Sequence, residues 1–157
     1  QKQPKEAFPV CDFGYIDTAN KTEVRGEGGK TGIFYLALGD AGLYKLCYDT
    51  KTEEIHVKRL TDTGDACYRM GLGVIGEDRD YLTEEKAIYF CGRLEGEYGF
   101  YRTFDEGKSY ERLNQDNQMY GEINSIDGDK RKFGRFFLAT GSRGVLYGEM
   151  KRQSRKI

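Results

Sequence analysis

The chain contains no tryptophan, one histidine and two prolines. It has no apolar run near the roughly 20 residues that a membrane-spanning helix requires. Its 25 basic and 26 acidic residues are interspersed and leave a net charge of −1. Because no large field of one sign results, we expect neither nucleic acid nor a membrane surface as a partner. The single histidine, His56, falls on a predicted outer strand and is expected to be inert.

The sequence also lacks the residue spacing of common metal-binding motifs. No Cys-x-x-Cys motif occurs, and the acidic stretch 77–80 lacks the spaced Asp, Asn and Gly pattern of a calcium loop. We therefore expect no metal and no cofactor. Each cysteine falls in or beside a predicted strand, where a free thiol behaves as a small buried hydrophobe. Buried thiols are favoured over one or two disulfides for the four cysteines, which are Cys11, Cys47, Cys67 and Cys91.

Glycine and the smaller aromatics are abundant, with 21 Gly, 12 Tyr and 9 Phe among 157 residues. This mixture favours short strands and tight turns over helices. Three stretches are versions of one another, namely residues 32–44, 87–102 and 135–147. Each contains an apolar strand, a glycine-containing turn and a second strand with an aromatic residue. A spacing of roughly 50 residues is typical of propellers and solenoids, whose units bury their faces by stacking on neighbours.

The predicted fold class is all-β, a partial β-propeller of about two and a half to three four-stranded antiparallel blades. The strands expected in the first unit are 9–16, 33–38, 43–48 and 55–60, and in the second 68–74, 87–92, 99–104 and 110–113. The third unit supplies 122–127, 136–140 and 145–149 and lacks a fourth strand. The glycine-rich, charged segment 18–31 is predicted to be a surface loop.

These units are expected to form one domain, residues 8–150, divided into blades 8–61, 62–115 and 116–150. Residues 1–7 are assigned to an N-terminal tail. The basic C-terminal tail, residues 151–157, is interpreted as a solvated terminus rather than a binding arm.

The strongest local motif spans residues 103–110, TFDEGKSY, which fits the Asp-box pattern Ser/Thr-x-Asp-x-Gly-x-Ser/Thr-aromatic. In such a turn the Asp side chain accepts backbone N–H groups, the glycine adopts a positive φ angle and the aromatic anchors the hairpin. The role is structural and not catalytic. The motif residues are Thr103, Asp105, Gly107, Ser109 and Tyr110.

Two longer stretches carry a family resemblance. Residues 96–121 read GEYGFYRTFDEGKSYERLNQDNQMYG, and residues 126–148 read IDGDKRKFGRFFLATGSRGVLYG. Together they are collinear with, and resemble, the C-terminal blades of the second β-propeller of glycoside hydrolase family 74, the xyloglucanases. About 90 residues resemble that family well, and the first 60 resemble it loosely.

The resemblance implies two seven-bladed propellers that face each other across a cleft for a glucan backbone. It also implies inverting hydrolysis of β-1,4-glucan by two aspartates, whose carboxyl groups lie roughly 6.5–9.5 Å apart in such enzymes. Neither aspartate has a counterpart in this chain, so we assign no catalytic residue and expect the chain alone to be inactive. It departs from the family pattern at Asn117, where the family has His, and at Tyr110, where the family has Trp.

The segment 114–122 joins the last two blades and, on this resemblance, could face the cleft. Gln118, Tyr120 and Glu122 would then offer polar groups and a ring to a glycan, although such loops are often only solvated. Arg143 is also a candidate for carbohydrate binding, where it could stabilise a carboxylate or a closure contact, although an arginine at a hairpin tip is more often structural.

Three hypotheses follow for function. The chain could belong to a family 74-like hydrolase acting on xyloglucan or a related β-1,4-glucan. It could instead be a non-catalytic carbohydrate-binding or protein-interaction module, or a structural protein whose ring closes by oligomerisation. Since 157 residues are too few for a ring of that size, each hypothesis requires another polypeptide segment or further copies. The start at Gln1 indicates either a processed form or an excised piece, and mature secreted chains often begin in this way. The sequon Asn20-Lys21-Thr22 adds little, because such tripeptides are common by chance. We expect a secreted or extracellular protein.

Overall fold

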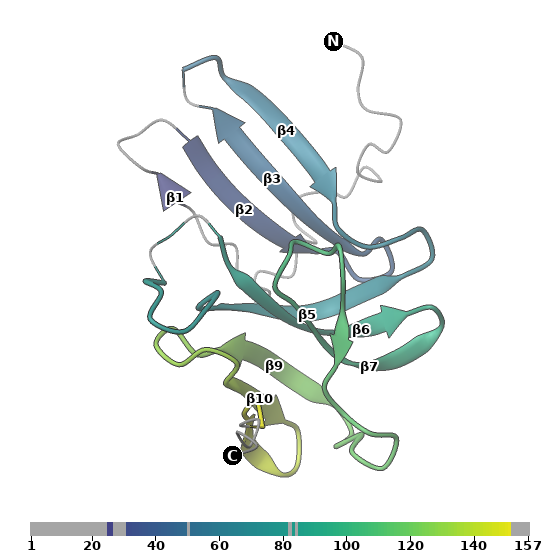
Figure 1. The fold of residues 1–157 in the computed structure, drawn as a ribbon. Coiled ribbons are helices and arrows are strands. Elements are labelled where there is room, and N and C mark those ends of the chain that lie inside the picture. The colour runs from purple at the N-terminus through teal and green to yellow at the C-terminus, as the bar shows by residue number, and fades with distance from the viewer. Residues whose placement is uncertain (1–24, 27–30, 50, 82, 84, 152–157) are drawn as a thin grey trace.

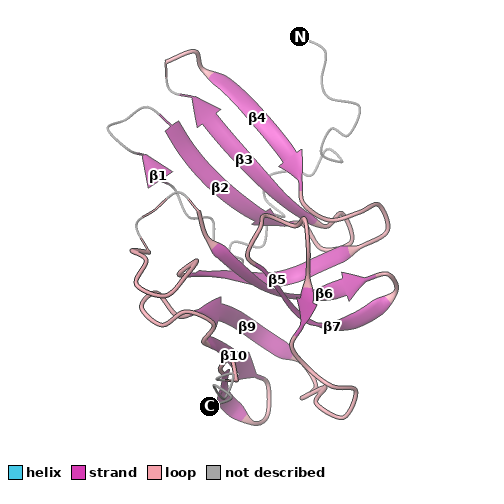
Figure 2. Ribbon diagram, viewed as in Figure 1, coloured by secondary structure: helices cyan, strands magenta, loops and turns pink. Residues whose placement is uncertain are grey.

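The computed structural model of the protein describes residues 25–26, 31–49, 51–81, 83 and 85–151. Within these residues every regular element is a β-strand, and the strands form three antiparallel sheets. Figures 1 and 2 show the sheets following one another in chain order. We call them blades 1, 2 and 3. The described part of the chain has no helix that could span a membrane.

Blade 1 has the strand order β1-β2-β3-β4. Its strands are β1 (Arg25–Gly26), β2 (Thr31–Ala37), β3 (Leu43–Asp49) and β4 (Glu54–Arg59). The last three confirm their predicted positions to within two residues. The predicted strand 9–16 lies outside the described residues. The prediction of a loop over 18–31 is wrong at Arg25 and Gly26, which form β1, and at Thr31, which begins β2. The pairing joins backbone groups, which every one of these residues has.

Blade 2 is a four-stranded meander with the order β5-β6-β7-β8, and blade 3 has three strands in the order β11-β10-β9. The strands of blade 2 are β5 (Ala66–Gly73), β6 (Ala87–Leu94), β7 (Glu97–Thr103) and β8 (Glu111–Arg112). Those of blade 3 are β9 (Ile123–Gly128), β10 (Phe136–Thr140) and β11 (Gly144–Gly148). The predicted strands of both units are confirmed. Among the described residues blade 3 has no fourth strand, as predicted.

Alternating side chains give each blade two faces, one toward the preceding blade and one toward the following blade. Between blades 1 and 2 the core contains Tyr35, Leu43, Met70, Ile88 and Phe90. Between blades 2 and 3 it contains Tyr89, Phe100, Ile126, Phe136 and Leu138. The core is therefore a pair of layers between stacked sheets. Three described cysteines have free thiols: Cys67 and Cys91 are buried and Cys47 is half-buried.

The inner strands β5 and β9 approach each other at backbone distance. A Cβ atom added to Gly71 would lie 2.4 Å from Asp127 Cα and 2.4 Å from the carbonyl oxygen of Ile126. Val74 N also donates a hydrogen bond of 2.9 Å to Asp129 O. Blades 2 and 3 therefore pack against each other in one fixed arrangement, which only a glycine at position 71 allows.

Antiparallel strands place related turns at the same end of the molecule. One end of the molecule carries the turns between the second and third strands of the blades, which are β2–β3, β6–β7 and β10–β11. The connections between blades, β4–β5 and β8–β9, begin at the same end, which we call the connection end. Two contacts confirm the arrangement. Gly39 and Cys67 exchange hydrogen bonds of 2.8 and 2.9 Å, and Gly141 N donates to Glu122 O at 3.0 Å. The 103–110 hairpin follows β7, away from the β6–β7 turn along that strand, and its Tyr110 reaches Leu60 in the β4–β5 connection.

Candidate functional site

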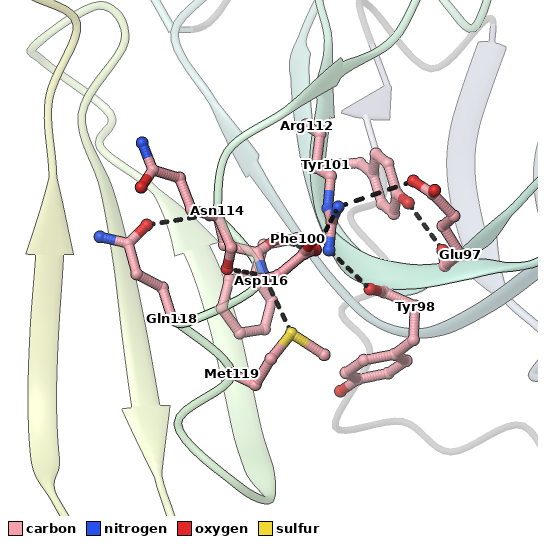
Figure 3. Close-up of polar contacts among 10 residues, drawn as sticks. Glu97, Tyr98, Phe100, Tyr101, Arg112, Asn114, Asp116, Gln118 and Met119 are labelled. Atoms are coloured by element: carbon pink, nitrogen blue, oxygen red, sulfur yellow. Dashed lines mark hydrogen bonds and ion pairs between the residues drawn. The ribbon is translucent and has the colours of Figure 1, made fainter.

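The β8–β9 connection is fixed at its start by a buried asparagine. Asn114 Oδ1 accepts a hydrogen bond from Phe100 N at 2.8 Å. Its Nδ2 donates to Gln115 O at 3.4 Å and to the sulfur of Met119 at 3.2 Å (Figure 3). These three bonds satisfy the amide and tie both ends of the turn to blade 2. These hydrogen bonds fix the conformation of the connection and so fix the positions of its exposed side chains.

Gln118 closes the same turn. Its backbone N donates to Gln115 O at 2.9 Å, and its side-chain Oε1 accepts from Gln115 N at 2.9 Å. The carbonyl half of the side chain is therefore occupied by the turn. In Figure 3 the amide nitrogen points away from that contact.

Tyr120 serves the core as well as the surface. Its ring lies nearly parallel to that of Phe100, with centroids 6.3 Å apart and an interplanar angle of 6°. The backbone at Tyr120 has a φ of 24°, a positive value that is uncommon for a non-glycine residue. The residue is half-buried, and the ring face that stacks on Phe100 is not available to a ligand.

Glu122 and Arg143 come from neighbouring segments. The Gly141 hydrogen bond to Glu122 O places the β10–β11 turn beside the connection. Within that turn, Arg143 N donates to Thr140 Oγ1 at 2.9 Å, and this hydroxyl donates to Gly144 O at 3.1 Å. Both the Glu122 and Arg143 side chains are exposed. The structure therefore places all four predicted glycan contacts at the connection end, on two adjoining segments.

Arg112 organises this region and was missed by the sequence analysis. Its Nη1 pairs with Asp116 Oδ1 at 2.9 Å and Glu97 Oε2 at 3.6 Å, and Nη2 donates to Tyr98 O at 3.3 Å (Figure 3). Its Nε is buried without a hydrogen-bond partner. The spacing of four residues to Asp116 was the only available signal, and it is too common to have been informative.

A second polar cluster at the connection end was also missed. The Tyr68 hydroxyl donates to Asp40 Oδ1 at 2.8 Å and accepts from Arg93 Nη2 at 2.7 Å. The Tyr68 ring lies 6.4 Å from that of Tyr98. Next to it, Arg69 Nε donates to Asn124 O in blade 3 at 3.2 Å. Polar groups and rings from all three blades therefore gather at the end that carries the predicted contacts.

The 103–110 hairpin joins β7 to β8. Asp105 Oδ1 accepts from Thr103 Oγ1 at 2.8 Å and Ser109 N at 2.9 Å, and Oδ2 accepts from Ser109 Oγ at 2.6 Å. The Ser109 hydrogen bonds lower the pKa of Asp105. Gly107 has a φ of 85°, and its N donates to Thr103 Oγ1 at 2.9 Å. The Tyr110 hydroxyl donates to Leu60 O in the connection after blade 1.

Among the residues that the structure describes, four carboxyl groups have a pKa displaced from its ordinary value, and all four are displaced downward. They are Asp105, Glu106, Asp129 and Glu149. Burial alone would raise the pKa of Glu106, but the hydrogen bond and charge of Lys45 outweigh it. A carboxyl stabilised as its anion is a poor proton donor near neutral pH, so these four suit structural hydrogen bonds and ion pairs rather than general acid catalysis.

Metal ligands do not gather in the described residues. No group of three His, Cys, Asp or Glu side chains there is placed to hold an ion.

Comparison with known proteins relates the chain to one family. No family profile matches it. It is 32% identical over 128 residues to the xyloglucanase Xgh74A of Acetivibrio thermocellus, covering 81% of this chain and 14% of that protein. It is 31% identical over 127 residues to the oligoxyloglucan-reducing end-specific xyloglucanase of Emericella nidulans, covering 78% of this chain and 15% of that protein.

A solved structure agrees. The GH74 xyloglucanase of Xanthomonas campestris superposes with a TM-score of 0.61 at 26% identity, covering 83% of this chain and 17% of that one. The stacked sheets and this match define the class of the protein, which is a partial β-propeller. Within that class, the chain is homologous to a segment of the glycoside hydrolase family 74 xyloglucanases. It spans about one seventh of the length of the curated relatives that it matches.

Proposed function

We propose that this chain supplies the C-terminal blades of the second propeller in a family 74-type hydrolase that acts on xyloglucan or a related β-1,4-glucan. The observation that carries the proposal is identity of 31–32% to xyloglucanases over about four fifths of the chain. The reaction is inverting hydrolysis, and both catalytic aspartates lie outside this chain. Since a polysaccharide substrate is met outside the cell, the protein acts extracellularly.

The glycan lies against the connection end. Gln118 donates from its side-chain amide nitrogen, since the amide oxygen already accepts from Gln115, and Glu122 and Arg143 offer an exposed acceptor and an exposed donor. Tyr120 offers its hydroxyl, because its ring already stacks on Phe100. The turn at residues 103–110 is an Asp-box with a structural role.

A chimera tests the proposal. In Xgh74A of Acetivibrio thermocellus, the matched segment is replaced by this chain, and xyloglucan is the substrate. We expect the chimera to release oligosaccharides well above the level of Xgh74A that lacks the segment. The first product detected by NMR should carry the α-anomer, as inversion of a β-bond requires. A chimera no better than the deletion, or a β-anomeric first product, would refute the proposal. Turnover by the isolated chain would refute the placement of the aspartates.

Conservative variants test the proposed contacts. Glu122→Gln removes a charge and keeps the shape of the side chain, and Tyr120→Phe removes a hydroxyl and keeps the stack on Phe100. In the chimera, each should raise the KM for xyloglucan by about 3- to 10-fold, which corresponds to the loss of one hydrogen bond. Glu54→Gln, on exposed β4 of blade 1, is the matched control. Unchanged KM in both test variants would remove the connection end from the glycan site.

A non-catalytic carbohydrate-binding or interaction propeller is the second candidate. It is favoured by the absence of tryptophan, the residue that most strongly provides large stacking surfaces. It predicts that the chimera binds xyloglucan oligosaccharides in calorimetry but cleaves none. In either case, another polypeptide segment or further copies complete the ring.

A further inference from the structure

The first strands of blades 2 and 3 each contain a β-bulge near their beginning. In β5 the register with β6 shifts at Tyr68, which has no cross-strand partner. In β9 the register with β10 shifts in the same way at Asn124. Both bulges lie at the connection end, because β5 begins beside the β2–β3 turn and β9 begins beside the β10–β11 turn. A bulge redirects the side chain that it carries, and bulges are over-represented next to active sites.

Arg69 joins the two bulges. Its Nη1 donates to Tyr68 O at 3.1 Å, and its Nε donates to Asn124 O at 3.2 Å. A guanidinium is planar and its donors have fixed directions, so one group that bonds to both carbonyls also sets their separation. The backbone positions from which the Tyr68 and Asn124 side chains project are therefore fixed relative to each other.

The Tyr68 hydroxyl brings an acid and a base together at the surface. It donates to Asp40 Oδ1 at 2.8 Å and accepts from Arg93 Nη2 at 2.7 Å. Arg93 Nη2 lies 3.9 Å from Asp40 Oδ1, and the side chains of Asp40 and Arg93 are 87% and 45% exposed. Among the described residues, Asp40 Oδ2, Arg93 Nη1 and the exposed Asn124 amide have no hydrogen-bond partner. An acceptor, a donor and an amide are thus left for a ligand.

Two tyrosine rings adjoin these polar groups. Tyr98 pairs with Arg93 across β6 and β7, and its ring centre lies 6.4 Å from that of Tyr68. Both tyrosines are half-buried, so part of each remains accessible. Tyr98 and Phe100 project from the same face of β7, and Phe100 stacks on Tyr120. The rings therefore form a row that leads to the predicted glycan contacts of the β8–β9 connection.

This combination of groups suits a neutral sugar. The C–H face of a sugar ring is apolar and packs against an aromatic side chain, while its hydroxyl groups both donate and accept hydrogen bonds. A charged ligand is matched less well, since Asp40 would repel an anion and Arg93 would repel a cation. An acid and a base at one place leave no net charge for either to pair with.

We infer that five residues of the connection end form a second glycan-contact cluster, which binds a neutral sugar unit of the β-glucan. We call them the bulge cluster: Asp40, Tyr68, Arg93, Tyr98 and Asn124. The nature of the ligand rests on the proposed function, but the inference does not require hydrolysis. Asp40 accepts from one sugar hydroxyl and Arg93 donates to another. This sugar unit lies next to the one contacted by the β8–β9 connection, along the row of rings.

An NMR titration of the isolated chain with xyloglucan oligosaccharides tests the inference. The isolated chain is expected not to cleave the oligosaccharides, so they stay intact during the titration. We expect saturable shifts of the Asn124 side-chain amide signals and of the Tyr98 ring signals. The Tyr120 ring signals should shift with the same Kd, because one glycan would span both places.

Two substitutions and a control identify the contacts. Asn124→Ala and Arg93→Met should each raise the Kd about 3- to 10-fold, as expected for one lost hydrogen bond, with the Tyr98 ring as the reporter. Asn124→Ala should leave the fold unchanged, since the amide that it removes has no hydrogen-bond partner among the described residues. Arg79→Met is the control, because the Arg79 side chain is 50% exposed and also forms a surface ion pair. It should leave the Kd unchanged.

Several results would overturn the inference. They are the absence of saturable shifts at Asn124 and Tyr98, a Kd that neither substitution changes, and a Kd that Arg79→Met raises equally. Tighter binding of oligogalacturonate than of xyloglucan oligosaccharides would also overturn it, because the cluster would then be an anion site.

The two proposals fail separately. Binding in the bulge cluster, together with no cleavage by the Xgh74A chimera, would sustain this inference and refute the hydrolytic function. Cleavage by the chimera without shifts at Asn124 and Tyr98 would sustain the proposed function and overturn this inference.

Discussion

Lys45 on β3 donates a hydrogen bond to Glu106 at the tip of the 103–110 hairpin, 61 residues later in the chain. Glu106 also accepts from the Tyr35 hydroxyl at 3.3 Å. The side chains of Lys45 and Glu106 are 17% and 29% exposed, respectively. One carboxylate therefore joins blade 2 to two strands of blade 1, in a site sheltered enough for the ion pair to affect stability.

Glu106→Gln should lower the free energy of unfolding by about 1 kcal/mol, between the values for exposed and buried ion pairs, because Lys45 loses its counter-charge in a sheltered site. Urea denaturation provides the measurement. Glu85→Gln is the control, since the Arg79–Glu85 pair has side chains 50% and 69% exposed and should contribute almost nothing. Equal effects of the two substitutions would contradict a special role for the Lys45–Glu106 contact.

The free energy of unfolding should fall as the pH is lowered below about 5. The pKa values of Asp105, Glu106, Asp129 and Glu149 are lower in the folded protein than their ordinary values. Groups with a depressed folded pKa stabilise the fold above their unfolded pKa of roughly 4, and this contribution is lost as pH falls through the folded pKa. The urea midpoint should therefore drop steadily from about pH 5 downward. Glu106→Gln should make that drop shallower, and a curve parallel to the wild type would contradict this.

Asp105→Ala should destabilise the protein by about 1–2 kcal/mol, because Ser109 N and two hydroxyls lose their acceptor. The melting temperature reports the change. The matched control is Lys108→Ala in the same turn, where the side chain is exposed and the expected change is within about 0.5 kcal/mol. A loss as large for Lys108→Ala would mean that the turn responds to any substitution rather than to the Asp105 contacts.

Gly71→Ala should cost about 3 kcal/mol or more, because the new Cβ would collide with the backbone of β9. Gly141→Ala is the control, since its Cβ would meet nothing nearer than 3.7 Å. Thermal unfolding separates the two. A mild effect at position 71 would show that blades 2 and 3 can move apart, and the fixed packing described above would then be wrong.

Much of the fold was predictable because it depends on neighbours in sequence. Alternating apolar and polar residues located strands β2 to β11, and glycine-containing turns separated them. The 103–110 hairpin was predictable for the same reason, because Thr103, Asp105 and Ser109 form hydrogen bonds with one another within seven residues. Strand β1 was missed because Arg25 and Gly26 carry no periodic pattern and are paired only through backbone groups.

The candidate site was predictable only in part. The resemblance to family 74 led to the 114–122 connection, and the structure places Gln118, Tyr120 and Glu122 there beside the turn of Arg143. The sequence analysis did not reveal that Tyr120 stacks on Phe100 or that Arg112 fixes the connection. It also missed the cluster of Tyr68, Asp40 and Arg93. These contacts join residues from different strands and blades, so their spacing in the chain carries no signal.

By itself, the sequence determined the strand order, the unit repeated three times and the turns, because backbone geometry and side-chain alternation act over a few residues. Only the tertiary structure decided which faces are covered. Tyr35, Tyr89 and Phe137 occupy the same position in their units, yet two are buried and one is open. Burial depends on the presence of a following blade to remove apolar area from water, and a residue's own neighbours in sequence do not encode that presence.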